Sequence, residues 1–369
     1  MALTDYRTMG RSGLVVSPQT LGTMTFGTNR WGADEATARA IFNAFVEAGG
    51  NAIDTADIYS GGRSEEMTGK FIAERALRDR IVLVTKSGFN SDVGNPNAGG
   101  NGAKNIIASL EGSLRRLNTD YVDLLIAHAW DVITPAEEVL QTFGDLIRAG
   151  KIRYFGLSNA PAWYIAKMAG LAAARGVPGP IAMQLEYSLT ERNIENEHIP
   201  AARDLGIGVM PWSPLDGGFL TGKYRREVVE AQDPNERGQA LPDTAGSATE
   251  QSSSRLNGSN PFGGSKFTPR NWAILETLQA VAADIGHSPA QVALAWLASR
   301  PAVSTTVLGA SRPEQIIDNV AALDIKLTGS NLETLDNAAV PDAIYPYPIA
   351  SPIVNRMMFG GRTVTSWKA

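Results

Sequence analysis

Four residues whose types could support carbonyl reduction lie at or just after short apolar segments in the first third of the chain. Asp54, Lys86 and His128 each end or follow such a segment, and Tyr59 stands five positions beyond Asp54. The carboxyl ends of parallel strands in a barrel meet at one mouth. If the segments are parallel strands, the four side chains are expected to converge.

The chemistry of these four types is complementary. Reduction of a carbonyl by a hydride donor needs a proton for the developing alkoxide, and a phenol such as Tyr59 can supply it when a cation lies beside it. Lys86 would be that cation, Asp54 would keep it charged and aimed, and His128 would orient the substrate oxygen. The alternative is structural: an Asp54–Lys86 ion pair, a tyrosine packed in a loop and a core histidine. Four suitable types in the right order favour the catalytic interpretation.

The segments Asp54-Thr-Ala-Asp-Ile-Tyr59, Thr85-Lys86 and His128 resemble the catalytic tetrad of the aldo-keto reductases. The resemblance covers nearly the whole chain and points to bacterial-type members related to the potassium-channel β-subunit branches. It implies a nicotinamide cofactor and an aldehyde, ketone or secondary alcohol as substrate. Tyr59 would be the general acid in reduction and the general base in oxidation.

Strand-like and helical segments alternate along the chain. Ala38, Ile41, Phe42 and Phe45, for example, repeat on one helical face. Eight strands alternating with helices predict an α/β fold, a (β/α)8 TIM barrel with long loops at its C-terminal mouth. The strands are expected at about residues 20–22, 52–54, 81–85, 122–127, 154–157, 181–186, 208–212 and 304–308.

Local signals mark the first element and two helix starts. Strand-like residues 6–9 and 14–16 flank Gly10-Arg-Ser-Gly13, which predicts an N-terminal β-hairpin across the barrel floor. The segments Thr134-Pro-Ala-Glu137 and Ser288-Pro-Ala-Gln291 each have the pattern of a capping box.

Length, composition and charge fit one large enzyme domain over residues 1–369, although length alone also allows two. The net charge of −5 comes from 33 basic and 38 acidic residues without a long basic run, which argues against nucleic acid or an anionic membrane as partner. Absence of cysteine excludes disulfides and thiolate metal sites. No segment looks like a signal peptide or a membrane span, so a cytoplasmic protein is expected. The oligomeric state stays open.

The chain has no Gly-x-Gly-x-x-Gly after an early strand, which disfavours a Rossmann fold. The resemblance instead places the cofactor across the barrel mouth. It implies that Ser158, Asn159 and Gln184 hold the nicotinamide carboxamide and that Tyr187 stacks on the ring. As alternatives, Asn159 could be a helix cap and Tyr187 a rim aromatic.

A glycine-rich segment follows the seventh expected strand and suits a pyrophosphate, because loops of this kind bring backbone amides against phosphate. The residues assigned to it are Ser213, Leu215, Gly218 and Lys223. Gly217, Gly222 and Lys223 also match the P-loop spacing, but Tyr224 stands where a magnesium-binding serine or threonine is required, which argues against nucleoside triphosphate hydrolysis.

The segment after the last expected strand starts a helix near the mouth, where an anion would gain from exposed amides. By resemblance, Arg312 would bind the ribose 2′-phosphate, and Gln315 and Asn319 would contact phosphate or adenine. NADP(H) is therefore preferred. Some branches of the family place a lysine and a second arginine where this chain has Gly309 and Gln315, so NAD(H) remains an alternative, and Arg312 could be an ordinary exposed residue.

Substrate recognition is expected in the loops after the strands, where bulky side chains would line an apolar pocket: Met24, Phe26, Trp31 and Trp130. Any of these could instead be a packing residue. Residues 224–270 are polar and read as a long loop that either closes over the pyrophosphate or is a surface insertion. Residues 341–369 read as an irregular tail of the kind that in this family often shapes the substrate pocket.

Two other functions are alternatives. Asp54, Asp57, His128 and Asp131 could meet at the mouth of a metal-dependent hydrolase, but three scattered histidines in the chain make a zinc site improbable, and no metal is expected. A second alternative is an NADPH-binding regulatory subunit with little turnover, like the potassium-channel β subunits. Since no partner-binding tail is recognisable, an enzyme is favoured.

Overall fold

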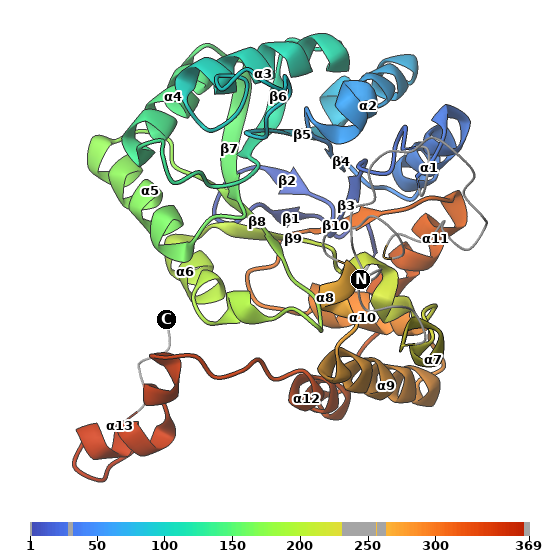
Figure 1. The fold of residues 1–369 in the computed structure, drawn as a ribbon, viewed down its shortest axis with the longest axis vertical. Helices are drawn as coiled ribbons and strands as arrows, with labels where there is room; N and C mark the ends of the chain where they lie inside the picture. The colour runs from blue at the N-terminus through green and yellow to red at the C-terminus, as the bar shows by residue number, and fades with distance from the viewer. Residues whose placement is uncertain (1, 29–31, 231–255, 257–262, 365–369) are drawn as a thin grey trace.

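A barrel of parallel strands forms the centre of the protein (Figure 1). The computed structural model describes residues 2–28, 32–230, 256 and 263–364. Every expected strand is present, and no bound differs from the expected one by more than two residues. The strands pair in the order β10-β3-β4-β5-β6-β7-β8-β9. They are β3 Gln19–Gly22, β4 Ala52–Asp54, β5 Val82–Ser87, β6 Val122–Ala127, β7 Ile152–Ser158, β8 Ala182–Glu186, β9 Gly208–Trp212 and β10 Thr306–Gly309.

Helices surround the strands and bury the outer face of the barrel (Figure 1). The alternation of strand and helix confirms the predicted (β/α)8 architecture. The longer helices are α1 Glu35–Glu47, α2 Arg63–Glu74, α3 Ala103–Leu117, α4 Ala136–Arg148, α5 Ala162–Arg175, α6 His198–Leu205, α9 Pro269–Asp284, α10 Pro289–Ala298, α11 Pro313–Ala321 and α12 Gly329–Ala338.

Backbone hydrogen bonds bring the two ends of the strand order together. The N–H of Val209 in β9 donates to the carbonyl of Ala302, and the N–H of Ser304 donates back to the carbonyl of Val209, at 2.9 and 3.0 Å. Ala302 and Ser304 lie in the segment just before β10. The sheet is therefore nearly closed, and its strand ends meet at one mouth.

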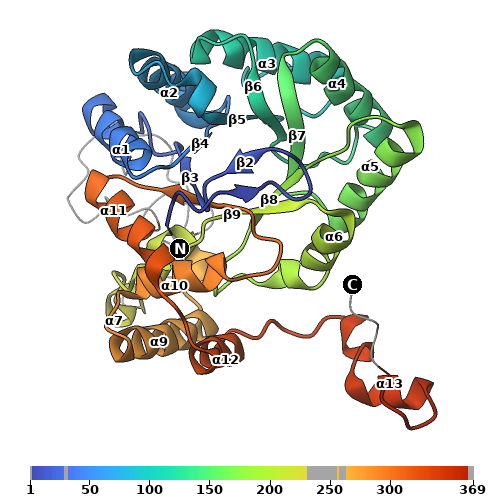
Figure 2. The ribbon, with the colours of Figure 1, turned by 180° about the vertical axis from the view of Figure 1, so that it is seen from behind.

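The predicted hairpin is present at the floor of the barrel. Its strands β1 (Arg7–Thr8) and β2 (Val15–Val16) pair antiparallel and cross one end of the barrel in the rear view (Figure 2). Met9 and Val16 are buried with side chains that point inward from the strands, including Ala52, Val84 and Met210. The hairpin thus fills the end of the barrel opposite the mouth.

One of the two predicted capping boxes is present. Asp34 caps α1 by accepting from the N–H of Thr37, and Ser288 and Gln291 form the predicted capping box of α10. The capping box at Thr134 is wrong. Helix α4 begins at Ala136 with Pro135 at the cap position, and the Thr134 hydroxyl instead donates to Asp131 at 2.9 Å.

Two stretches expected to be irregular contain helices. Within 224–270 lie α7 (Arg226–Glu230), α8 (Gly263–Lys266) and the start of α9, while residues 231–255 and 257–262 lie outside the described residues. The tail contains the 3₁₀ helix η7 (Tyr347–Ile349) and helix α13 (Pro352–Met358). Both ribbon views show α13 standing away from the barrel (Figures 1 and 2). Earlier in the tail, the Tyr347 hydroxyl donates to Glu197 in the loop between β8 and α6, and a role of the tail in the substrate pocket stays a prediction.

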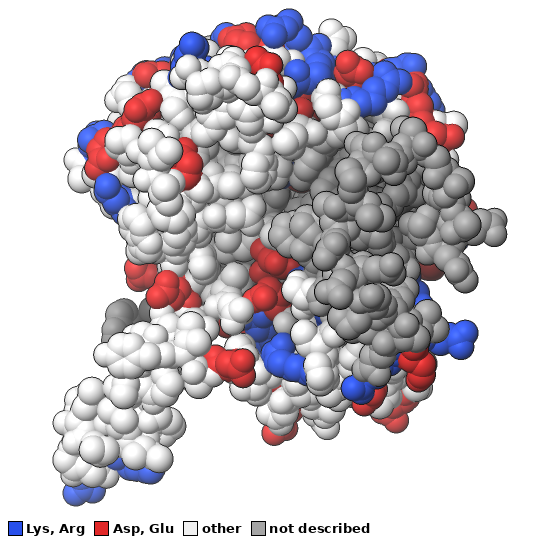
Figure 3. Space-filling view, viewed as in Figure 1, with Lys and Arg blue, Asp and Glu red and all other residues white. Residues whose placement is uncertain are grey.

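The surface carries charge of both signs. Basic and acidic side chains are interspersed around the barrel on the face shown in Figure 3, and the projecting tail is mostly uncharged. Among the described residues no helix combines the length and apolar character that crossing a bilayer requires.

Candidate active site at the barrel mouth

The register of the sheet brings the first group of candidate residues together. Asp54, the last residue of β4, pairs with Val84 of β5, and Lys86, near the end of β5, pairs with Ile126 of β6. His128 follows β6, and its N–H donates to the carbonyl of Ser87 at 2.8 Å. Three neighbouring strands therefore deliver these side chains to one part of the mouth, as predicted.

Lys86 is the centre of this group. Its ammonium donates to Asp54 Oδ2 at 2.6 Å, to the carbonyl oxygen of Thr55 at 2.9 Å and to the Tyr59 hydroxyl oxygen at 3.1 Å. The Lys86 side chain is 0% exposed and that of Asp54 is 2% exposed. Because an ammonium group has three N–H donors, all of them are used, and the lysine is fixed in one orientation.

Charge and burial act in opposite directions on Lys86. Burial alone would lower its pKa, but the Asp54 carboxylate and the Tyr59 hydroxyl outweigh burial, and the pKa of Lys86 is raised above its ordinary value. The lysine is therefore cationic at neutral pH, as the predicted role requires.

His128 is held neutral in the same environment. Burial, together with the positive charge of Lys86, lowers the pKa of His128 to about 3. Its ring contacts that of Tyr59 edge to face, with centroids 5.8 Å apart. A neutral imidazole at this place can exchange a hydrogen bond with a substrate oxygen, but it is not a cation at neutral pH.

Tyr59 lies at the edge of an open hollow. It starts the 3₁₀ helix η1 (Tyr59–Gly62), in which Ser60 and Gly61 have positive φ, and it lines the hollow with Met24, Gly27, Thr28, Ile58 and Ser60. Phe89 packs edge to face on His128 at 4.7 Å and remains 42% exposed. Sequence reasoning missed Phe89, which follows Lys86 in the loop after β5.

The residues assigned to the nicotinamide carboxamide have different surroundings. Ser158 is buried, and its hydroxyl has no hydrogen-bond partner among the described residues. Gln184 donates from Nε2 to Asp54 Oδ1 at 2.9 Å. Asn159 donates from Nδ2 to the carbonyl oxygen of His128 at 2.9 Å and accepts from Trp212 at 3.1 Å. Ser158 and Gln184 pair across the ends of β7 and β8, so all three residues do lie at the mouth.

The stacking role predicted for Tyr187 is wrong. Its ring is 1% exposed and packs against Trp296 of α10 at 5.7 Å, and its hydroxyl donates to Glu195 at 2.6 Å. Burial and the bond to Glu195 raise the pKa of Tyr187 above its ordinary value. A ring enclosed between the barrel and its helices has no face to offer to a ligand.

Trp212 has the position that Tyr187 was expected to have. It ends β9, pairs with Glu186 of β8, and its indole N–H donates to the Asn159 side chain at the end of β7. The ring therefore spans the ends of three strands at the mouth and is only partly buried. An aromatic platform of this kind can stack on a planar heterocycle.

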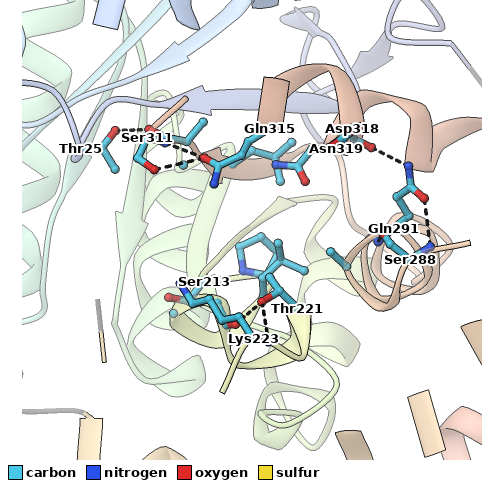
Figure 4. A pocket seen from close by; sticks show the side chains of 18 residues that line it. Thr25, Ser213, Thr221, Lys223, Ser288, Gln291, Ser311, Gln315, Asp318 and Asn319 are labelled. Atoms are coloured by element: carbon cyan, nitrogen blue, oxygen red, sulfur yellow. Dashed lines mark hydrogen bonds between the residues drawn. The ribbon is translucent and has the colours of Figure 1, made fainter. Parts of the chain in front are cut away.

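A cavity lies between the ends of β9 and β10 (Figure 4). Ser213, Thr221 and Lys223 come from one wall and Ser311, Gln315 and Asn319 from the other, with Ser288 and Gln291 of α10 at one end. The predicted cofactor residues that line it are Ser213, Leu215, Gly218, Lys223, Gly309, Gln315 and Asn319. Sequence reasoning missed Thr25, Ser288, Gln291 and Asp318.

Arg312 is exposed at the start of α11 and is not among the residues that line this cavity, whereas Lys223 is. The contact of Arg312 with a ribose 2′-phosphate stays a prediction. Gln315 is partly engaged at the start of α11, where its side-chain oxygen accepts from the N–H groups of Ser311 and Arg312 at 2.8 and 3.3 Å. The main chain of Arg312 thus contributes to the helix start, and its guanidinium lies outside the cavity.

The cavity has the features of a phosphate site. Gly217 and Gly218, in the 3₁₀ helix η4 (Asp216–Thr221), have φ of 65° and 91°. Residues with a side chain rarely adopt such a backbone conformation. Because glycine has no Cβ, the main chain here can approach a ligand closely. Lys223 supplies a cation on the same wall. These residues fit the pyrophosphate of a dinucleotide.

The substrate-wall predictions had mixed outcomes. Met24 lines the hollow beside Tyr59. Phe26 does not: it is 0% exposed and packs on Phe71 in the core. Trp130 is partly buried against Trp163 and Tyr164, and Trp31 lies outside the described residues. Phe26 therefore has the packing role that was its alternative, and the substrate-wall role of Trp130 stays a prediction.

In the part of the chain that the structure describes, no group of three or more histidine, aspartate or glutamate side chains is arranged to bind a metal ion. Asp54 is committed to Lys86 and Gln184. Asp131 accepts from the N–H groups of Asn101, Ile133 and Thr134, which holds the loop after β6.

The chain is similar in sequence to a known protein family and to several known proteins. Residues 20–340 match the model of the aldo/keto reductase family. The chain is 37% identical over 339 residues to a putative voltage-gated potassium channel subunit beta of Schizosaccharomyces pombe, covering 90% of this chain and 92% of the relative. It is 34% identical over 354 residues to an uncharacterized oxidoreductase, YrpG, of Bacillus subtilis, covering 93% and 97%. It is 30% identical over 344 residues to norsolorinic acid reductase of Aspergillus flavus, covering 91% and 81%.

Proposed function

The chain belongs to the aldo/keto reductase family, and we propose that it is an NADP(H)-dependent enzyme that interconverts a carbonyl compound and an alcohol, with Tyr59 as the proton-transfer group. The family match and the oxidoreductases among its relatives confirm the resemblance found in the sequence and make an oxidoreductase the coarser assignment. The finer assignment of cofactor, substrate class and residues is our proposal.

The observation that carries the proposal is the set of three hydrogen bonds made by Lys86. Since the ammonium donates to the Tyr59 oxygen, the phenol accepts on that side and can direct its own proton to a substrate oxygen in the hollow that it lines. The lysine charge stabilises the phenolate that remains after transfer. In the oxidative direction the same phenolate accepts the proton of the alcohol.

His128 would align the substrate oxygen. It lies against Tyr59, and its low pKa keeps the imidazole neutral. A neutral ring does not compete with Tyr59 as the acid at physiological pH, so it would act by hydrogen bonding and by shape. Phe89 and Met24 would form apolar walls on either side of the reacting oxygen.

The cofactor would lie across the mouth from the phosphate cavity toward Tyr59. A bound nicotinamide would supply or accept the hydride. Trp212 would carry the ring on its indole face, Ser158 and Gln184 would lie beside the carboxamide, and the glycine-rich segment around Gly218 would hold the pyrophosphate. The preference for NADPH is supported by the family. Lys223 would contact the pyrophosphate, which NADPH and NADH share, and Arg312 would have to swing inward to contact the 2′-phosphate.

The test is consumption of NADPH in the presence of a panel of aromatic and aliphatic aldehydes and ketones, with NADH measured in parallel. Turnover with at least one carbonyl and a lower KM for NADPH than for NADH would support the proposal. Failure to bind either dinucleotide would refute it.

A second function, a cofactor-binding regulatory subunit, is supported by the name of the Schizosaccharomyces pombe relative, a putative potassium channel subunit beta. The same residues would then bind NADPH and turn it over slowly. Tight binding of NADPH without consumption across the whole panel would favour this function over the enzyme.

A further inference from the structure

Lys266 is a buried cation shared by two carboxylates behind the phosphate cavity. Its ammonium lies 2.8 Å from Asp216 Oδ1 and 2.7 Å from Glu186 Oε1. The Lys266 side chain is 15% exposed and that of Asp216 is 1% exposed. Asp216 also accepts a hydrogen bond of 2.7 Å from the Thr190 hydroxyl at its other oxygen. The Lys266–Asp216 contact is therefore a largely buried ion pair, not a pair of exposed side chains.

The position of Lys266 is itself well defined. Its carbonyl oxygen accepts from the Asn271 side chain at 2.9 Å. The next residue, Phe267, packs on Phe219 at 5.9 Å and on Trp272 at 5.9 Å. Phe219 belongs to η4, the segment that forms one wall of the cavity. Side-chain packing and the ion pair thus join the same two segments.

Neither Lys266 nor Asp216 lines the cavity, but the neighbours of Asp216 do. Leu215, Gly217 and Gly218 all face it, and Asp216 itself has a φ of 50° at the start of the turn. Positive φ is uncommon outside glycine, and aspartate is one of the residue types that adopt it most often. Lys266 and Thr190 each contact one oxygen of the Asp216 carboxylate, so they hold the turn that faces the cavity.

The balance of charge points the same way. Two carboxylates, Glu186 and Asp216, share one ammonium. Burial alone would lower the pKa of Lys266, but Asp216 and Glu186 outweigh burial and raise it. Loss of the ammonium would leave a buried, uncompensated carboxylate directly behind a site that we assign to a pyrophosphate. The negative charges of the Asp216 carboxylate and of the pyrophosphate would then repel each other, and repulsion is stronger in a partly buried setting than in water.

We propose that Lys266 is a positioning residue for the dinucleotide: by neutralising Asp216 and holding the Asp216–Gly218 turn, it makes the wall of the cavity able to accept a pyrophosphate. This inference rests on the proposed function, because it presumes that a dinucleotide binds in the cavity shown in Figure 4. It assigns to a residue of α8, outside the cavity, control over cofactor affinity.

The test measures the Kd of NADPH by fluorescence titration for the full-length wild-type protein, three test variants and one control variant. Lys266→Met removes the charge and retains most of the side-chain length. Lys266→Arg retains the charge. The double variant Asp216→Asn with Lys266→Met removes the charges of the Lys266–Asp216 pair and keeps an amide that Thr190 can still contact. The Glu186 carboxylate remains in this variant, but it is 29% exposed, whereas Asp216 is 1% exposed. Lys167→Met is the matched control, because Lys167 forms an exposed pair with Glu137 on the outer helices.

We expect Lys266→Met to raise the Kd by about tenfold to a hundredfold, consistent with an uncompensated buried charge. The Kd is expected to stay within about threefold of wild type in Lys266→Arg and to be largely restored in the double variant, whereas a purely structural loss would persist there. The kcat at saturating NADPH should change far less than the Kd in Lys266→Met, and Lys167→Met should bind like wild type.

The outcomes separate the two proposals. Wild type that binds no dinucleotide overturns the proposed function and this inference with it. Wild type that binds NADPH while Lys266→Met binds equally well overturns the inference alone. Unfolding followed by circular dichroism identifies a variant that fails to fold. If Lys266→Met does so, the comparison of the double variant with wild type decides, and weak binding by a folded double variant contradicts the electrostatic role.

Discussion

Gln184 and Asp54 are joined by a hydrogen bond of 2.9 Å from the amide Nε2 to Oδ1, and Lys86 binds the other carboxylate oxygen at 2.6 Å. Both oxygens of a carboxylate that is 2% exposed are therefore engaged. The resemblance to the family implies that Gln184 holds the nicotinamide carboxamide. Its bond to Asp54 makes it also a support for the lysine that faces Tyr59.

The first prediction concerns this bond. Gln184→Met keeps the length of the side chain and removes the donor, so the Asp54 carboxylate loses one of its partners and the lysine is aimed less well. A hydrogen bond to a buried charge contributes about 1.5–3 kcal/mol, and we expect kcat to fall about tenfold to a hundredfold. Steady-state kinetics at saturating NADPH measure this. An unchanged kcat would show that Asp54 does not need Gln184.

The second prediction concerns His128. With a pKa of about 3, it is neutral between about pH 5 and 8, so its protonation should produce no change in kcat/KM over that range. The measurement is the pH profile of carbonyl reduction, with His128→Asn as the comparison. An acid limb near the ordinary histidine pKa that disappears in His128→Asn would contradict the neutral assignment.

The third prediction concerns the stability cost of a buried acid. Burial and the nearby Glu65 carboxylate raise the pKa of Asp57 from 3.8 to about 7. The folded state therefore binds this proton more tightly than the unfolded state does, so the penalty is full above pH 7 and disappears as the pH falls toward 4. We expect Asp57→Asn to raise the free energy of unfolding by about 2–4 kcal/mol at pH 8 and by much less at pH 4.

Urea denaturation at the two pH values measures the effect of Asp57→Asn. Asp145→Asn is the control, because Asp145 is 56% exposed in its ion pair with Arg148, and it should change stability little at either pH. Equal effects of Asp57→Asn at pH 8 and pH 4 would mean that Asp57 is not protonated on folding.

The fourth prediction concerns the aromatic platform. Trp212→Ala should raise the Kd of NADPH by about tenfold, since stacking of an aromatic side chain on a heterocycle contributes about 1–3 kcal/mol, and Trp212→Phe should retain most of the affinity. Trp163→Ala is the control, because Trp163 is 56% exposed on α5. Cofactor fluorescence titration reports all three. Full affinity in Trp212→Ala would remove Trp212 from the site.

The sequence predicts the barrel and the first part of the site because both depend on local patterns. Strand ends marked by Asp54, Lys86 and His128 are visible in the chain, and parallel pairing then brings them together. The glycine-rich segment near Gly218 can also be recognised in the sequence, because its positive φ angles favour glycine.

The prediction that Tyr187 faces the mouth conflicts with the alternation of side chains between the two faces of a strand. Met183 and Leu185 of β8 pack in the outer core together with Tyr187, so Tyr187 continues the face that meets the helices. In β9, Met210 points into the barrel, and Trp212, two positions on, continues the inward face. Applied to both strands, the alternation would have predicted Trp212 for the mouth.

Other features could not be found in this way. The contact of Lys266 with Asp216 joins segments separated by fifty positions, part of which lies outside the described residues, and no local pattern encodes it. The place of Arg312 outside the cavity depends on how α11 begins after β10. Such features depend on tertiary packing rather than on periodicity.

The central claim is that Tyr59 transfers the proton, and the most direct test is Tyr59→Phe measured for two properties at once. We expect NADPH to bind with a Kd within about threefold of wild type, because the phenol contributes to the hollow and not to the phosphate cavity, while turnover falls by at least about a hundredfold, because no group replaces the acid. Tyr59→Phe that binds NADPH normally and reduces the same carbonyl at the wild-type rate would contradict the account.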